Sequence, residues 1–304
     1  MVVAATGFFD GVHRGHRAVL DTVIDIAAKQ GKIPAVVTFW PHPRAVLQQD
    51  AAKFRLLTTL EEKKRLLGNL GIEQVHVLPF NKEFAAQTTQ QFFQKYLVGM
   101  FGVSTLVAGY DHRVGNDLDQ TQQQMFEIAR SLGIEPVRVG EFENTKDHVV
   151  ISSTKIREAL CGGDIPFATS MLGYRYGLEG AVVEGKKIGR TMGFPTANIK
   201  LYEPLKLLPA NGVYAVWVEV QNKIYKGITN IGTRPTVSLG NEKSIETHIL
   251  GFDEDIYGLP LKLEFVERLR AEEKFASLDQ LKSQLEIDSG SANAILTGQS
   301  VKLR

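Results

Sequence analysis

The stretch that decides the fold is Thr6-Gly-Phe-Phe-Asp-Gly-Val-His-Arg-Gly-His16. A short apolar run, Val2–Ala5, precedes it, and apolar residues at helical spacing follow it from Val19 to Ala27. Three glycines between a strand and a helix predict a loop whose backbone can approach a phosphate closely. Since ligands of open parallel sheets bind beyond the carboxyl ends of the strands, we expect a nucleotide site here.

Two histidines of this loop, His13 and His16, are three residues apart and project to the same side at the start of a helix. Two imidazoles there can donate hydrogen bonds to a triphosphate as charge develops on its leaving group. The alternative is that His13 caps the helix and His16 packs on the surface. The position of the pair, on a glycine loop directly after the first strand, favours the phosphate site.

Strands and helices alternate through the first half of the chain. After the helix, with Gly31 as its C-terminal cap, the pattern predicts strands at Ile33–Phe39, Gln74–Leu78, Thr105–Ala108 and Pro136–Val139. It predicts helices at Glu61–Leu70, Thr89–Leu97 and Gln120–Leu132. This alternation indicates an α/β domain, a parallel sheet with helices on its faces.

The rhythm changes near Cys161, and helices largely vanish after Gly173. Strands are predicted at Tyr176–Glu184, Gly212–Val220, Lys223–Thr229, Ile245–Gly251 and Leu261–Val266, with one closing helix at Leu278–Ile287. This pattern is typical of a small antiparallel β-barrel. The boundary is expected between about Ala168 and Tyr174, which gives domains at residues 1–168 and 173–304.

A second candidate phosphate-binding segment is Ile151-Ser-Ser-Thr-Lys-Ile-Arg157, which reads as a strand end entering a helix. Ser153 or Thr154 is expected to cap that helix, and Thr154 and Arg157 are expected to share one of its faces. An arginine beside hydroxyls at a helix start suits the β- and γ-phosphates of ATP. The alternative is a plain capped helix with a solvated arginine.

The run from Lys186 to Asn198 joins two predicted strands and is rich in glycine. Gly189 and Gly193 permit a close approach to phosphates, and Pro195 fixes the entry into the following strand. Thr196 and Asn198 are two residues apart, so they face the same side of a strand. Their hydroxyl and amide oxygens are hard ligands that suit Mg²⁺.

Glu246 is the candidate base for a phosphoryl acceptor. On a strand it faces the same way as His248, opposite to Ile245, Thr247 and Ile249. A carboxylate in that position can accept the proton of an attacking hydroxyl. The alternative is a cross-strand ion pair with a lysine.

Composition sets limits on the kind of partner. The net charge is +1, and residues 1–150 hold 16 Lys and Arg against 16 Asp and Glu. Neither half is a basic surface for nucleic acid, so we expect no nucleic-acid partner. One cysteine, no charged leader before an apolar core, and no apolar run of bilayer length indicate a cytoplasmic protein with no membrane contact.

The glycine-rich stretch resembles the nucleotidyltransferase superfamily, and Phe-Asp-Gly-Val-His within it resembles the FMN adenylyltransferase module of bacterial FAD synthetases. The segments Ile151–Arg157 and Gly109–Gly115 are similar to two further motifs of that module. The resemblance implies His13, His16 and Arg157 as catalytic residues. It implies nucleotide contacts from Gly7, Phe8, Asp10, Gly15, Asp111, Ser153 and Thr154.

Three residues depart from that family pattern. Trp40, in Thr38-Phe-Trp-Pro-His-Pro43, stands where the family often carries an acidic residue. Its ring can stack on a flavin, and packing as an ordinary buried or rim tryptophan is the alternative. His112 and Val114 stand where aromatic residues are common, which weakens the expectation of ring stacking at those positions.

The second half resembles bacterial riboflavin kinase. The shared runs include Gly-Arg-x-x-Gly-Phe-Pro-Thr-Ala-Asn198, Asn230-Ile-Gly-Thr-Arg-Pro-Thr236, Glu246-x-His248 and Arg268–Phe275. The resemblance implies a six-stranded barrel, Mg²⁺ and ATP phosphates on Thr196 and Asn198, and Glu246 as catalytic base. It also implies nucleotide contacts from Gly189, Gly193 and Pro195, and flavin contacts from Arg234 and Phe275.

Together these features predict a bifunctional enzyme that converts riboflavin to FMN and FMN to FAD, with ATP, Mg²⁺ and the three flavins as its partners. Three alternatives stay open. The first domain can merely bind nucleotide beside an active kinase. The chain can be a different nucleotidyltransferase, acting on a pantetheine or nicotinamide phosphate, with a binding barrel. It can also be a flavin store without activity.

Overall fold

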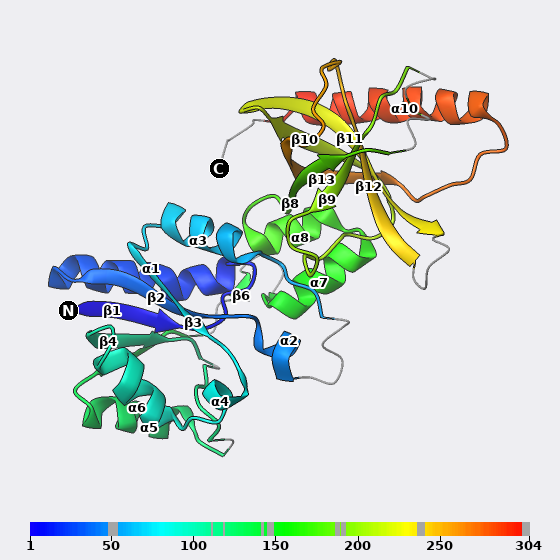
Figure 1. Cartoon of the computed structure of the whole chain (residues 1–304). Coiled ribbons are helices and arrows are strands. Elements are labelled where there is room, and N and C mark those ends of the chain that lie inside the picture. Colours follow the sequence, from blue (N-terminus) through cyan, green and yellow to red (C-terminus); the bar gives the residue numbers. More distant parts are fainter. Residues whose placement is uncertain are drawn as a thin grey trace. The chain divides into compact units, whose positions relative to one another are not determined.

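The computed structural model describes residues 1–47, 54–110, 112–117, 119–140, 143–144, 149–185, 189, 193–235 and 241–299. The chain divides into two compact units, Met1–Ser153 and Thr154–Arg304. Figure 1 shows the elements of each unit along the chain. None of the helices in the described ranges combines the length and the apolar content needed to cross a bilayer.

The first unit is built on a five-stranded parallel sheet with the order β3-β2-β1-β4-β5. Its strands are β1 (Val2–Thr6), β2 (Ile33–Trp40), β3 (Gln74–Pro79), β4 (Val103–Ala108) and β5 (Glu135–Arg138). Because the chain winds outward in one direction from β1 and in the other from β4, the order reverses between these two strands. That reversal is where ligands of open α/β sheets bind.

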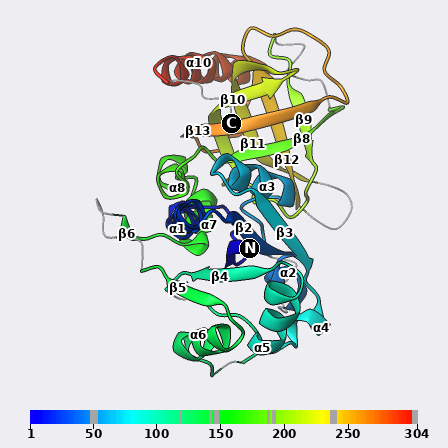
Figure 2. The ribbon, with the colours of Figure 1, turned by 90° about the vertical axis from the view of Figure 1, so that its left-hand side faces the viewer.

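Helices cover both faces of this sheet. They are α1 (Arg14–Gln30), α2 (Pro43–Leu47), α3 (Leu60–Asn69), α4 (Lys82–Ala85), α5 (Thr89–Phe92), the π-helix η2 (Phe93–Val98) and α6 (Gln122–Ser131). Two short strands, β6 (Glu143–Asn144) and β7 (Val149–Val150), pair separately. Figure 2 shows α1 and α6 on opposite sides of the sheet.

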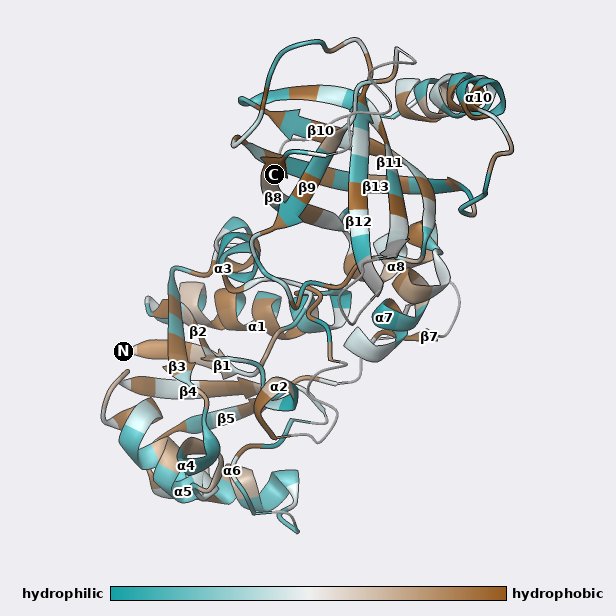
Figure 3. Ribbon diagram, turned by 45° about the vertical axis from the view of Figure 1, so that its right-hand side comes forward, coloured by the Kyte–Doolittle hydropathy of each residue, from teal (hydrophilic) through white to brown (hydrophobic). Residues whose placement is uncertain are grey.

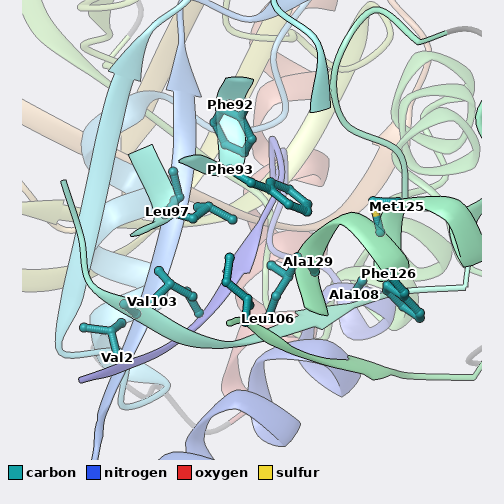
Figure 4. Packing of buried hydrophobic residues seen from close by; sticks show 14 of the residues in the cluster. Val2, Phe92, Phe93, Leu97, Val103, Leu106, Ala108, Met125, Phe126 and Ala129 are labelled. Carbon is teal, nitrogen blue, oxygen red and sulfur yellow. The ribbon is translucent and has the colours of Figure 1, made fainter. Parts of the chain in front are cut away.

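The residues of strand β1 show why helices must cover both faces of the sheet. All five of its residues are buried, and they alternate between two clusters. Val3 and Ala5 pack with α1 and with Leu67 of α3, whereas Val2 and Ala4 pack with η2 and α6. Figure 4 shows the second cluster, with Phe92, Phe93 and Leu97 facing Leu106 and the α6 residues Met125, Phe126 and Ala129. A strand buried on both sides reads as a continuous apolar run.

The second unit is a closed six-stranded barrel with the order β10-β11-β12-β9-β8-β13. Its strands are β8 (Gly177–Val183), β9 (Ala197–Leu201), β10 (Gly212–Val220), β11 (Lys223–Pro235), β12 (Asn241–Ile249) and β13 (Pro260–Arg270). The strands alternate in hydropathy along their length, as Figure 3 shows for β11 and β12. Closure leaves no strand edge exposed to pair with another chain.

Among the described residues, the helices that accompany the barrel are α7 (Ser153–Gly162), α8 (Ile165–Leu172) and α10 (Leu278–Thr297). Helix α10 covers Val213, Ala215 and Trp217 with Ala292 and Leu296. Because these β10 residues face α10, the alternate residues face the barrel interior, where the rings of Tyr214 and Phe265 meet edge to face at 5.2 Å. Burial raises the pKa of Tyr214 to about 12.

The predicted fold class is confirmed in both halves: a parallel sheet comes first, and an antiparallel barrel with a closing helix follows. The predicted strand ends differ at β11, which continues from Thr229 to Pro235 because its partner β12 extends equally far. The closing helix continues beyond Ile287 to Thr297. The packing units divide at Ser153, within the first residues of α7, while the boundary between residues 168 and 173 stays a prediction.

Candidate functional sites

The loop after β1 is held in an unusual backbone conformation. Phe9 and Val12 have φ values of 46° and 38°, and Gly11 between them has 85°. Bulky residues in the left-handed region persist only where the surrounding structure enforces them, commonly at functional sites. Phe9 and Val12 are both buried under α1, which provides that enforcement.

Asp10 holds this loop in place. Its carboxylate accepts hydrogen bonds from the amides of Leu57 and Thr58 at 3.0–3.1 Å and from the Thr58 hydroxyl at 3.2 Å, while the Gly11 amide donates to that hydroxyl at 3.1 Å. Asp10 is 3% exposed. These contacts are those of a residue that positions the loop, and a direct nucleotide contact from Asp10 stays a prediction.

The two histidines lie together at the start of α1, as predicted. Their rings stack with centroids 3.6 Å apart, and the ring of Phe9 meets His16 edge-on at 5.2 Å. His13 is the N-cap residue, because its Nδ1 accepts from the His16 amide at 3.3 Å. A neutral His13 therefore carries its proton on Nε2, which makes that atom a donor. Gly15 lies against the His13 ring, where a Cβ would come within 3.3 Å.

His16 is held neutral. Burial lowers its pKa well below 6.5, and the charges of His13 and Lys63 act in the same direction. Its Nδ1 is buried and has no hydrogen-bond partner in the described part of the chain. A buried polar atom without a partner needs an explanation, and a ligand that supplies the missing hydrogen bond is one.

Lys63 of α3 lies beside this loop and has no counterpart among the predicted site residues. It is 2% exposed, its Nζ lies 3.5 Å from the Thr38 hydroxyl, and it lies 6.0 Å from the centroid of the Trp40 ring. The Thr38 hydroxyl lies 3.4 Å from the carbonyl of Phe8. Burial lowers the pKa of Lys63 to about 8, opposed by the charge of Asp10.

The predicted loop after β4 reaches the end of β1. His112 Nε2 lies 2.7 Å from the Thr6 hydroxyl, and Val114 packs against the apolar cluster of the sheet. Its neighbour Asp111 lies outside the described residues. The ring of Phe8 packs against Phe39 and His42, at 5.2 and 5.0 Å between centroids. The Gly7 amide, at the start of the loop, donates to the Val37 carbonyl at 3.1 Å.

Ser153 corrects one detail of the prediction. It is the first residue of α7, so the N-cap position belongs to the residue before it, and the Ser153 hydroxyl donates to the Asp10 carbonyl at 2.9 Å. Thr154 and Arg157 lie on the first turns of α7, as predicted. Their contacts with ATP phosphates stay a prediction.

In the barrel, strand register brings the predicted catalytic residues together. Asn198 of β9 and Glu246 of β12 are direct cross-strand partners, and Asn230 of β11 flanks Glu246 on the other side. Directly paired residues share a face of the sheet, with Cβ atoms about 5 Å apart. The alternate β12 residues Ile245 and Thr247 are buried, so Glu246 lies on the outer face. Asn198 is 7% exposed.

Glycines keep the backbone close to Asn198. Gly185 has no room for a Cβ against the Asn198 amide, and Gly189 has none against the Phe194 carbonyl. The Phe194 amide donates to the Gly189 carbonyl at 2.9 Å, which closes a loop over Gly193, where φ is 83°. These close approaches pack the backbone at Gly185 and Gly189 tightly against Asn198 and Phe194.

His248 ties this loop to the barrel. Its Nδ1 lies 2.8 Å from the Pro195 carbonyl, and its ring meets Phe194 edge-on at 5.2 Å. Thr196 therefore follows a proline that is fixed to β12, one residue before β9 begins at Ala197.

The predicted flavin-binding residues have different surroundings. Trp40 ends β2 and is half-buried beside Lys63. Phe275 of the second unit lies 5.5 Å from the Arg270 guanidinium. The side chain of Arg234 lies outside the described residues. Flavin contacts from these three residues stay predictions.

Sequence reasoning missed Lys63, His248 and Asn230 as members of the two sites. A signal for Lys63 existed, because it shares a helical spacing with Leu66, Leu67 and Leu70 and so occupies the apolar face of α3. His248 and Asn230 stand in the shared runs Glu246-x-His248 and Asn230–Thr236, but those runs assign them no role, because their positions follow from strand register and from a loop that packs back on β12.

The first unit is a doubly wound parallel sheet with a glycine-rich loop after β1. The second is a barrel in which the Asn198 amide and the Glu246 carboxylate are cross-strand partners near Gly185 and Gly189. Together these features define a class of two-domain nucleotide-dependent transferases. The sequence model of the FAD synthetase family matches residues 1–155, and that of riboflavin kinase matches residues 172–296. The chain belongs to the family of bifunctional riboflavin kinase/FMN adenylyltransferases.

Relatives agree with this assignment over the whole chain. The bifunctional riboflavin kinase/FMN adenylyltransferase of Bacillus subtilis is 39% identical over 95% of this chain and 91% of its own length. That of Escherichia coli strain K12 is 38% identical over 94% and 90%. A crystal structure named as a macrolide-efflux protein from Streptococcus pneumoniae has a TM-score of 0.87 and 33% identity, and covers 96% of this chain and 94% of that one.

Proposed function

We propose that this chain carries out both reactions of its family. The second unit transfers the γ-phosphoryl group of ATP to riboflavin, which gives FMN and ADP. The first unit transfers the AMP part of ATP to FMN, which gives FAD and pyrophosphate. The observation that carries the proposal is the cross-strand pair of Asn198 and Glu246 beside a glycine cradle, in a chain whose first half matches the FAD synthetase family.

The kinase reaction needs a base and a place for the triphosphate. Glu246 accepts the proton of the ribityl hydroxyl as its oxygen attacks the γ-phosphorus and ADP leaves. The backbone at Gly193 can approach the phosphates, since a Cβ there would meet no atom of the described residues within 4 Å. Phosphoryl transfer relies mainly on positioning and charge stabilisation, which fits a site with a single base.

The residues beside Glu246 fit Mg²⁺. Thr196 and Asn198 offer a hydroxyl and an amide oxygen, and substrate phosphates would complete the shell of this ion. Bound there, Mg²⁺ would neutralise charge that develops between the β- and γ-phosphates. Asn198 and Thr196 would hold it, while Glu246 keeps its carboxylate for the flavin hydroxyl.

The adenylyl transfer needs no base, because the FMN phosphate is already ionised. An oxygen of that phosphate attacks the α-phosphorus of ATP, and pyrophosphate leaves. His13 donates from Nε2 and the neutral His16 from one ring nitrogen as charge builds on the leaving group. Arg157 and Thr154 of α7, together with Gly7, Phe8, Gly15 and Ser153, support the triphosphate in this proposal.

The partners are small molecules: ATP, riboflavin, FMN and FAD. A balanced charge in each half offers no surface for nucleic acid, and we infer neither a nucleic-acid nor a membrane partner. The cytoplasm supplies ATP and keeps the exposed thiol of Cys161 reduced, so we place the protein there. The functional modules of this proposal are residues 1–168 and 173–304.

A time course tests the proposal. The full chain is incubated with riboflavin, ATP and Mg²⁺, and the three flavins are separated by chromatography. FMN should rise first and FAD should follow after a lag, with one ADP released for each riboflavin consumed and one pyrophosphate for each FAD formed. Formation of FMN without any FAD would leave only the kinase, and formation of neither product would refute both assignments.

A further inference from the structure

Lys63 is a charged residue on the buried, apolar face of α3. Helix α3 begins with a capping box in which Glu62 accepts from the Thr59 amide at 2.8 Å. The next residue, Lys63, is 2% exposed, whereas the side chain of Lys64 is 41% exposed and pairs with Glu61 at 2.9 Å. Lysine is almost never fully buried unless it is paired, so this placement needs a reason.

The surroundings of Lys63 offer it little compensation. The hydrogen bond that its Nζ makes to the Thr38 hydroxyl is long, at 3.5 Å, and the Trp40 ring lies 6.0 Å away. Asp10 acts on it as an opposite charge, but the Asp10 carboxylate already accepts from the amides of Leu57 and Thr58. An ammonium group with a pKa of about 8 is still mostly protonated at pH 7.

The ammonium group of Lys63 lies close to the glycine loop after β1. Thr38 is near the carboxyl end of β2, next to β1 in the sheet, and its hydroxyl reaches the Phe8 carbonyl of the glycine loop. The charge of Lys63 is close enough to His16 to contribute to its lowered pKa. Lys63 therefore lies at the edge of the sheet where the ligand of this fold binds, between the glycine loop and Trp40.

We propose that Lys63 binds a phosphate group of a substrate in the first unit, and that its buried place on α3 is retained for this contact. A desolvated ammonium beside an incoming polyanion gains far more from the ion pair than an exposed one would. The proposal rests on the proposed adenylyl transfer and deepens it. The phosphate belongs to FMN or to ATP, and the experiment separates the two.

The test compares K63M with the matched control K64M on the same helix. Four quantities are measured on the full chain: FAD formation from FMN and ATP, the Kd for FMN, the Kd for ATP, and the midpoint of thermal unfolding. For K63M we expect FAD formation to fall at least tenfold, one of the two Kd values to rise at least tenfold, and the unfolding midpoint to stay equal or rise. K64M should stay within twofold of the parent chain in every assay.

The two Kd values show which phosphate Lys63 contacts. FAD formation by K63M within twofold of the parent chain would overturn the inference. So would a loss of FAD formation with a lower unfolding midpoint and both Kd values unchanged, because that is the behaviour of a structural lysine. If K63M fails to fold, K63Q is judged by the same criteria. A parent chain that forms no FAD refutes the proposed transfer itself, whereas a parent and a K63M that form it equally refute only the role of Lys63.

Discussion

At the residue scale, His16 combines three observations that are rarely found together. Its ring stacks on His13, its Nδ1 is buried without a partner in the described part of the chain, and its pKa is lowered well below 6.5 by burial. A neutral imidazole at this point keeps one N–H that can donate a hydrogen bond to an anion. The same burial has a consequence for stability that can be measured independently of activity.

Because the pKa of His16 is lower in the folded protein than in the unfolded chain, the unfolded chain binds more protons below pH 6.5. Stability contributed by the neutral ring is therefore present above pH 6.5 and is lost as the pH falls through the folded pKa. We expect H16N to lose less unfolding free energy than the parent between pH 7 and pH 5. Chemical denaturation at each pH measures this, and parallel losses in both proteins would contradict it.

The sequence indicated part of this site and missed part of it. The spacing of His13 and His16 was enough to predict that their rings meet, since residues three positions apart at the start of a helix lie on the same face. It did not show that His13 uses Nδ1 as a cap, because that depends on the backbone before α1. The nucleotide contact of Asp10 stays a prediction, and the sequence did not show that its carboxylate anchors the loop to Leu57 and Thr58, which are distant in sequence.

At the element scale, the kinase site depends on how β9 pairs with β12. The alternation in β12 predicted which side Glu246 would face, because its neighbours Ile245 and Thr247 are apolar or buried. Strand β9 could not be bounded from its sequence, since Thr196 belongs to the preceding loop and the strand is only five residues long. The pairing of Asn198 with Glu246 is a property of register, which propensity does not encode.

His248 gives a prediction about this loop. Replacing it with alanine removes the contact with the Pro195 carbonyl and frees the loop that carries Thr196. The loss of one hydrogen bond is worth about 1 kcal/mol, so we expect the KM for ATP in FMN formation to rise about fivefold to tenfold. The value of kcat should change less, and FAD formation from supplied FMN should be unaffected. An unchanged KM for ATP would show that His248 does not position the loop.

Helix α10 gives a prediction about stability. Asp288 is 2% exposed, and its carboxylate accepts from Arg270 at 2.8–3.1 Å and from Gln284 at 2.9 Å. Removing one partner of a buried pair leaves the other uncompensated, so D288A should lower the unfolding free energy by about 3 kcal/mol. D279A, at the exposed start of the same helix, should cost well under 1 kcal/mol. If urea unfolding shows equal losses of unfolding free energy for D288A and D279A, the Asp288–Arg270 pair does not hold α10 against the barrel.

At the scale of the whole molecule, the chain consists of two compact units with different folds. We assign one proposed reaction to the glycine loop of the parallel sheet and the other to the barrel. Composition and periodicity were sufficient to predict this division of architecture, because continuous apolar strands indicate a buried parallel sheet and alternating ones a barrel. They were insufficient for α8 and for the pairing order of the barrel, which follow from packing between distant segments.

The central claim is that each half houses its own complete site, and mixing two single variants tests it most directly. H16A and E246Q are supplied with riboflavin, ATP and Mg²⁺, first separately and then together. Alone, H16A should stop at FMN and E246Q should leave riboflavin unchanged, each with the missing step slowed at least about a hundredfold. Mixed, they should produce FAD, because FMN made by one protein is used by the other. A mixture that yields no FAD while both variants remain folded, or an E246Q that phosphorylates riboflavin at the parent rate, would contradict the account.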